Sequence, residues 1–128
     1  MLDSRRANIT GQIDKPVNAP TSNRVPTGIV SLDRIIEGGL CRGDTIIVAG
    51  QPGTGKTTLG LQFLHHGATK CGENGVYASV IESSERLKRN GSRFGWDFNR
   101  LEAENKVSLV SLQQTMKAGV STTLETVL

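Results

Sequence analysis

The chain contains the stretch Gly50-Gln51-Pro52-Gly53-Thr54-Gly55-Lys56-Thr57-Thr58, which fills every fixed position of the pattern G-x-x-x-x-G-K-[ST]. This pattern forms a glycine-rich loop, the P-loop, whose backbone N–H groups hold the phosphates of a nucleotide. An apolar run at residues 45–49 predicts a buried strand before the loop, and residues 59–66 predict a helix after it. Since strand, loop and helix in this order are what phosphate binding requires, the sequence predicts a site for a nucleoside triphosphate.

Each type of side chain in the loop has a predicted role. The predicted nucleotide-binding residues are Gly50, Gln51, Pro52, Gly53, Thr54, Gly55, Lys56, Thr57 and Thr58. The three glycines are expected to adopt positive φ and to let the backbone approach the phosphates without a clashing Cβ atom. Lys56 is the predicted cation for the β- and γ-phosphates and thus a candidate catalytic residue. The hydroxyl of Thr57 is the predicted Mg²⁺ ligand, and Thr58 is placed to contact the α-phosphate.

Hydrolysis requires a carboxylate that holds Mg²⁺ through water and a group that orients the attacking water. In P-loop enzymes the first is an Asp at the end of a later apolar strand, the Walker B residue. The chain has no Asp after Asp97, and the predicted strand at residues 106–111 runs into Leu112 and Gln113. Glu82 ends another predicted strand, at residues 75–81, on the sheet edge where the P-loop should lie. From the residues alone, a catalytic Glu82 that polarises water and an ordinary solvated glutamate remain equal alternatives.

The 128 residues leave room for one domain. Residues 1–26 are polar and predict a flexible N-terminal arm, or a strap that docks on a neighbouring subunit, and residues 27–128 predict a partial nucleotide-binding domain. Ser31 is the expected N-cap of a helix that stops at Gly38 and Gly39, and Ser83 is the expected N-cap of a helix over residues 84–94. A short helix is expected in the last residues, 120–128. Strands that alternate with helices predict an α/β fold with a mainly parallel sheet covered on both faces.

Composition narrows the class of protein. Hydrophobic residues make up 36% of the chain and charged residues 21%, with a formal net charge of +3. No apolar run approaches the roughly 18 residues of a membrane span, and no secretory signal is recognised, so a cytoplasmic protein without membrane contact is expected. The mild positive charge permits nucleic-acid contact but does not support it. The basic helix with Arg86, Lys88, Arg89 and Arg93 is interpreted as a solvated face or as a contact to ATP or a carboxylate of an adjacent subunit.

Beyond the P-loop, several further phrases are similar to one known family. They are Thr27-Gly28-Ile29-x-x-Leu32-Asp33, Gly38-Gly39-Leu40-x-Arg42-Gly43, Leu61-Gln62-Phe63-Leu64, Glu82-Ser83-x-Glu85-x-Leu87 to Asn90, and Phe94-Gly95-Trp96-Asp97. Together they resemble the RecA-like ATPases, and among these KaiC and the KaiC-like proteins, over residues 25–112. The resemblance implies a three-layer αβα P-loop fold, ATP with Mg²⁺, and ring-shaped homo-oligomers with nucleotide between subunits.

The sequence departs from the KaiC-like pattern at two places. The family usually has two adjacent glutamates after the second strand, whereas this chain has Ile81 and Glu82. The core also stops after about three strands, before the expected Walker B strand, so we expect marginal stability, self-association, or assembly with a full-length relative.

These departures leave two functions open. One is ATP hydrolysis with Glu82 as the water-polarising group, and the alternative is a non-hydrolysing module in which ATP controls assembly. A small P-loop kinase fits poorly because 44 residues precede the first predicted core strand. The sequence offers no test of a role in DNA recombination.

Overall fold

The computed structural model describes residues 23–118, and residues 1–22 and 119–128 lie outside that description. Most of the predicted N-terminal arm and the helix predicted over residues 120–128 therefore fall outside the described residues. The chain divides into two compact units, Met1–Thr45 and Ile46–Leu128. The whole P-loop and Glu82 belong to the second unit.

The first unit is a small β-hairpin closed around one helix. Strand β1, Arg24–Val25, pairs antiparallel with β2, Leu40–Cys41, and helix α2, Val30–Ile35, lies between them in the sequence. Gly39 has φ +131°, and a Cβ atom there would lie 2.2 Å from the carbonyl oxygen of Val25. The missing side chain of Gly39, just before β2, is therefore what lets the two strands meet.

The expected N-cap of this helix was wrong. The structure places the N-cap at Ile29, without a side-chain cap, and Ser31 lies inside α2. Asp33, almost fully buried, instead reaches back to the preceding turn, where its carboxylate accepts hydrogen bonds from Thr27 N at 2.8 Å, Thr27 Oγ1 at 2.7 Å and Gly28 N at 3.2 Å. A carboxylate with three donors satisfies this turn better than a serine hydroxyl would, because each bond to an ionised acceptor is charge-assisted.

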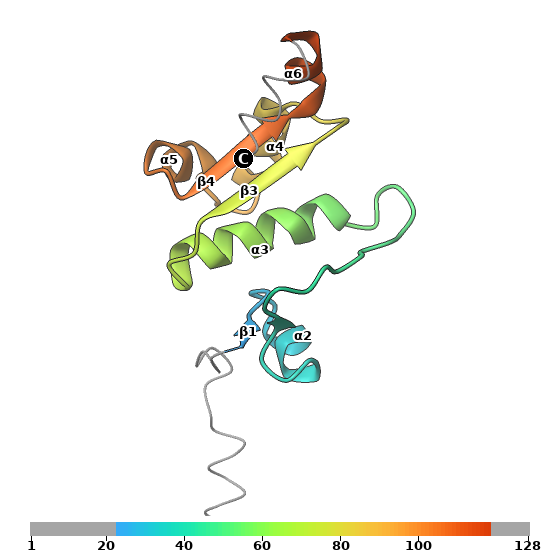
Figure 1. Ribbon diagram of the computed structural model, residues 1–128, viewed down its shortest axis with the longest axis vertical. Coiled ribbons are helices and arrows are strands. Elements are labelled where there is room, and N and C mark those ends of the chain that lie inside the picture. Colours follow the sequence, from blue (N-terminus) through green and yellow to red (C-terminus); the bar gives the residue numbers. More distant parts are fainter. Residues whose placement is uncertain (1–22, 119–128) are drawn as a thin grey trace, which may run out of the picture. The chain divides into compact units, whose positions relative to one another are not determined.

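The second unit begins at Ile46, passes through the P-loop and continues as helices and strands (Figure 1). Its elements are α3, Lys56–Lys70; β3, Gly75–Ser79; α4, Ser84–Ser92; α5, Phe98–Ala103; β4, Val107–Ser111; and α6, Leu112–Ala118. Strands β3 and β4 are parallel, with Gly75 opposite Val107 and Ser79 opposite Ser111. The predicted helix after the P-loop, the helix after Ser83 and the two later strands are thus confirmed, while α5 and α6 were not anticipated.

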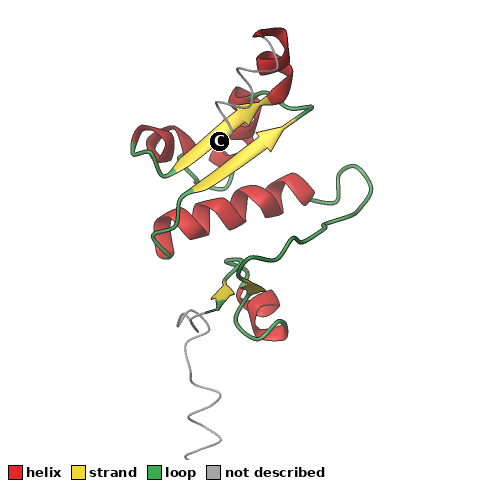
Figure 2. Ribbon diagram, in the orientation of Figure 1, coloured by secondary structure: helices red, strands yellow, loops and turns green. Residues whose placement is uncertain are grey.

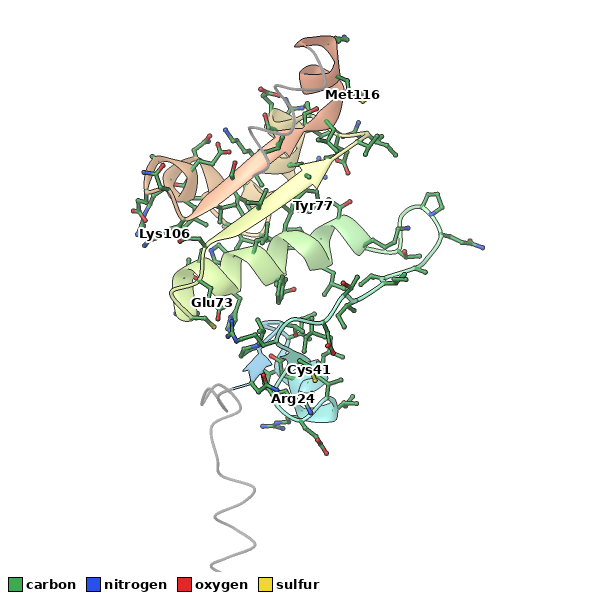
Figure 3. All side chains as sticks on the ribbon, in the orientation of Figure 1. Arg24, Cys41, Glu73, Tyr77, Lys106 and Met116 are labelled. Atoms are coloured by element: carbon green, nitrogen blue, oxygen red, sulfur yellow. The ribbon has the colours of Figure 1, made fainter. Side chains whose placement is uncertain are left out.

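Helices α3, α4 and α5 share one hydrophobic core with a single face of this sheet. The buried core residues are Leu61, Ala68, Leu87, Phe98, Leu101, Val107 and Leu109. Tyr77 lies between β3 and α3 (Figure 3), where its ring approaches Gly60. The next residue position along each strand faces the opposite way, and there Val76 remains 54% exposed. Among the described residues, helices therefore cover the Tyr77 face, and much of the opposite face is open.

Residues 45–49 do not form the predicted strand. They belong to the extended loop between β2 and α3 (Figure 2), and Ile46, Ile47 and Val48 are 48%, 88% and 51% exposed. The apolar pattern is that of a buried strand, but a strand also needs a hydrogen-bonding neighbour. Within residues 23–118, no strand pairs with this segment.

Candidate functional site

The P-loop connects the extended segment 45–49 to the first turn of α3. Gly53 and Gly55 have φ values of +84° and +95°, and Gly55 is the N-cap of α3. Gly50 is not among the residues with positive φ, so one expectation for the loop was wrong. Its requirement is steric, because a Cβ atom on Gly50 would lie 2.7 Å from Thr54 Oγ1. That hydroxyl is already engaged, since it donates to the carbonyl of Gln51 at 2.8 Å.

The Lys56 side chain bends back over the loop. Its Nζ donates to the carbonyl oxygens of Gly50 and Gln51, the second at 3.0 Å. These contacts place the ammonium group inside the curve of the P-loop, beside the first turn of α3. The N–H groups of that turn and the helix dipole favour an anion at the same place. Lysine, loop and helix terminus thus combine into one electropositive site.

Glu82 lies three residues beyond the carboxyl end of β3 and faces the start of α3. Thr57 Oγ1 donates a hydrogen bond to Glu82 Oε1 at 3.2 Å. The backbone N–H of Glu82 donates to Ser79 Oγ at 2.8 Å, which fixes the turn after the strand. The Glu82 side chain is only 23% exposed. The structure therefore brings together Thr57 and Glu82, two residues that are 25 positions apart in the sequence.

Two residues of α4 that the sequence analysis did not assign to the site hold the second oxygen of Glu82. Asn90 Nδ2 donates to Glu82 Oε2 at 3.3 Å, and Arg86 Nε lies 3.6 Å from the same oxygen. Ser83 begins this helix, since its hydroxyl accepts from Arg86 N at 3.3 Å. The spacing of four residues between Glu82 and Arg86 was a usable signal, because residues four apart meet once a helix forms.

The end of β4 adds no carboxylate to this edge of the sheet. The strand finishes at Ser111, which is buried, and the chain continues directly into α6 through Leu112. In the part of the chain that the structure describes, no group of three or more His, Cys, Asp or Glu side chains is close enough to hold a metal ion. The oxygen donors at the site are thus the hydroxyl of Thr57 and the carboxylate of Glu82, and these are the ligand types that Mg²⁺ prefers.

Comparison with known proteins agrees with this arrangement. Residues 25–126 match the model of a family described as "ATPase: KaiC". The chain belongs to the KaiC family of ATPases. This result confirms the resemblance seen in the sequence and assigns the chain to a family of nucleotide-binding proteins.

Individual relatives give the extent of the match. A circadian clock oscillator protein KaiC of Prochlorococcus marinus subsp. pastoris is 39% identical over 87 residues, which are 68% of this chain and 17% of that protein. A UPF0273 protein of Saccharolobus solfataricus is 41% identical over 68% of this chain and 31% of its own length. The chain therefore spans less than a third of either relative.

A solved structure supports the same assignment for the fold. The crystal structure of a KaiC-like protein of Pyrococcus horikoshii OT3 superposes with a TM-score of 0.67 at 43% identity, covering 69% of this chain and 41% of the other. The predicted RecA-like α/β fold class is confirmed. Among the residues described here, no helix is both long and apolar enough to cross a membrane.

Proposed function

We propose that this chain binds ATP with Mg²⁺ at the P-loop and that Glu82 polarises the water that attacks the γ-phosphate. The observation that carries the proposal is the hydrogen bond of 3.2 Å between Thr57 Oγ1 and Glu82 Oε1. It puts the Glu82 carboxylate beside the hydroxyl at the start of the phosphate-binding helix. A solvated glutamate at a strand end has no reason to be held there by side chains of two helices.

The residues present fit Mg²⁺. The ion favours oxygen ligands and usually binds one or two carboxylates together with substrate phosphates. Thr57 would offer its hydroxyl to the ion, and the carboxylate of Glu82 lies within hydrogen-bond distance of that hydroxyl. Bound there, Mg²⁺ would neutralise charge on the phosphates.

The other roles in hydrolysis belong to groups of the chain itself. The N–H groups of the loop and Lys56 would bind the β- and γ-phosphates. Glu82 would accept a proton from a water molecule. The oxygen of that water then forms a bond to the γ-phosphorus, and the bond between the γ-phosphorus and the bridging oxygen of ATP breaks. The products are ADP and inorganic phosphate. Such a positioned base contributes a factor of about 10² to 10⁴ in rate.

A second candidate function rests on the end of β4. Because β4 ends at Ser111 and continues into α6 without a carboxylate, the chain fits a nucleotide-dependent assembly module that binds ATP without hydrolysing it. Family membership supports a homo-oligomeric ring, or association with a full-length relative, as the assembled form. Measurement of the molar mass by light scattering, with and without Mg-ATP, tests this assembly.

Two variants separate these functions. Mg-ATP at ~100 times its dissociation constant should stabilise the folded chain by about 2.7 kcal/mol, and Lys56→Ala should abolish this gain. Glu82→Gln should retain the gain, and if the chain is a hydrolase it should lose most of its turnover. Binding without turnover in the unaltered chain supports the assembly module. Turnover that survives in Glu82→Gln contradicts the catalytic role of Glu82.

A further inference from the structure

We propose that α4 carries a second anion site, for a phosphate group of a small molecule, outside the P-loop. The surface beside this helix is hollowed into a cleft of about 420 Å³. The cleft is lined by Ser83, Glu85, Arg86, Arg89, Asn90 and Arg93. No residue of the P-loop lines it, so the two sites are distinct.

The charge of the cleft is the first argument. Three arginines face one glutamate, which leaves two positive charges without a counterpart in the lining. Among the described residues, neither Arg89 nor Arg93 has an acidic partner. Lys88 of the same helix shows the contrast, because it turns away and pairs with Glu102 at 2.5 Å.

Geometry is the second argument. Arg86 and Arg89 lie three positions apart on α4, and Arg93, the C-cap of the helix with a helical backbone, follows seven positions after Arg86. This spacing puts the three arginines on one face of a helix. Guanidinium groups present planar pairs of N–H donors that match phosphate oxygens, and they are more weakly hydrated than an ammonium group. Three of them around one cleft form a better receptor for a phosphate than for a single carboxylate, which carries less charge.

The lone acid of the cleft, Glu85, offsets only one of its three positive charges. A hydrogen bond to its own backbone N–H, and further ones from Ser83 and Ser84, lower the pKa of Glu85. Glu85 lies in the first turn of α4, where the helix dipole also favours its charged form. Arg89 and Arg93 lie beyond this first turn.

The cleft is connected to the candidate catalytic carboxylate. Arg86 and Asn90 line the cleft, and both also contact Glu82 Oε2, at 3.6 Å and 3.3 Å. The Arg86 side chain is 72% exposed, so Glu82 holds it loosely. A phosphate in the cleft and the Glu82 carboxylate therefore compete for one guanidinium group. Such competition makes the two sites energetically coupled, and the coupling must act in both directions.

The first experiment measures pyrophosphate binding by calorimetry in the full chain with Lys56→Ala, which weakens binding at the P-loop. The double variant Arg89→Gln with Arg93→Gln should weaken binding by about tenfold or more, because charge-assisted hydrogen bonds are lost. Lys70→Gln with Lys117→Gln is the matched control, since both lysines are exposed and outside the cleft. Equal weakening in both double variants would mean that only net charge matters, and it would overturn the proposal, as would unchanged binding.

The second experiment tests the connection to Glu82 on the same Lys56→Ala background. Glu82→Gln should tighten pyrophosphate binding severalfold, because Arg86 loses its competing carboxylate. Unchanged or weaker binding in Glu82→Gln would overturn the coupling. Inorganic phosphate and ATP are compared as ligands to distinguish a free anion from the phosphates of a nucleotide. Neither experiment measures hydrolysis, so both outcomes stand even if the proposed catalytic role of Glu82 fails.

Discussion

The carboxylate of Glu82 is restrained from two sides. One oxygen accepts from Thr57 in the first turn of α3, and the other accepts from Asn90 near the end of α4. Neither bond is short, but together they leave the side chain little freedom to rotate. A base that acts on water depends on such restraint, since small errors in position reduce the rate strongly.

Asn90→Ala tests this restraint. In a chain that hydrolyses ATP, we expect kcat to fall by about tenfold with KM little changed, because the lost bond positions Glu82 and does not bind nucleotide. Steady-state kinetics measure both parameters. Asn99→Ala, on the exposed surface of α5, is the control. A rise in KM with unchanged kcat would show that Asn90 acts on binding instead.

At the scale of elements, α4 and α5 pack through a glycine. Gly91 is buried, and a Cβ atom there would lie 2.5 Å from Phe98 Cδ2 and 2.6 Å from Phe98 Cε2. The Phe98 ring is itself 1% exposed and belongs to the hydrophobic core. The close approach of the two helices therefore depends on the missing side chain.

Gly91→Ala should destabilise the second unit by about 1–3 kcal/mol, as overpacking of a core does. Gly67→Ala is a matched control inside α3, where the nearest atom to an added Cβ is 3.9 Å away. That change should stabilise by about 0.4–1 kcal/mol, because alanine loses less backbone freedom than glycine on folding. Urea denaturation followed by circular dichroism measures both. Equal effects of the two substitutions would contradict this packing argument.

The same elements show what the sequence could predict. The P-loop motif, the cap at Ser83 and the apolar runs located α3, α4, β3 and β4, because those signals are local. Helix α5 has only six residues, too few for a periodic pattern, although Asp97 caps it by accepting from Arg100 N at 3.1 Å. The strand predicted at residues 45–49 was wrong although its sequence signal is not weak. Its pattern is strong, but pairing depends on a neighbour that local sequence does not reveal.

Some residues of the candidate site could be predicted from local sequence, and others could not. The motif predicted Lys56 and Thr57, and strand polarity predicted that Glu82 would lie on their side of the sheet. The partners of Glu82 on α4 could not be predicted, because they depend on how that helix packs. The sequence therefore identified the functional groups of the site, and the structure was needed to show the contacts between residues of different helices and strands.

At the scale of the whole molecule, segment 46–48 is the longest continuous run of exposed large apolar residues in the described part of the chain. Ile47 is 88% exposed and its neighbours are about half exposed, in a backbone without a strand partner among the described residues. Such a segment favours pairing with other chains. We therefore expect segment 46–48 to form the contact between chains when this protein self-associates.

Ile47→Lys should raise the concentration at which the chain associates by about tenfold, because burying an isoleucine contributes about 1.5–3 kcal/mol. Ile35→Lys is the control, since Ile35 is 79% exposed on α2 and has no extended apolar neighbours on both sides. Analytical ultracentrifugation over a range of concentrations measures the effect. If both variants associate like the unaltered chain, another surface is responsible.

Stability of the second unit should also depend on pH through His65. Its ring stacks on Trp96 with centroids 5.5 Å apart and meets Phe98 edge-on at 6.2 Å. Burial against these rings lowers the pKa of His65 from its ordinary value near 6.5, and the charges of His66 and Lys70 lower it further. The folded chain therefore takes up this proton at a lower pH than the unfolded chain does.

The sign of the effect follows from proton binding. Between the lowered pKa of folded His65 and the unfolded value near 6.5, the unfolded state binds more protons, so the free energy of unfolding falls as pH is lowered through this window. Below the folded pKa both states are protonated and the loss levels off. His65→Gln removes the titrating group, so urea midpoints measured from about pH 5 to 8 should change less in this variant than in the unaltered chain. Parallel curves for the two proteins would show that other groups set the pH dependence, whatever the variant does to stability at neutral pH.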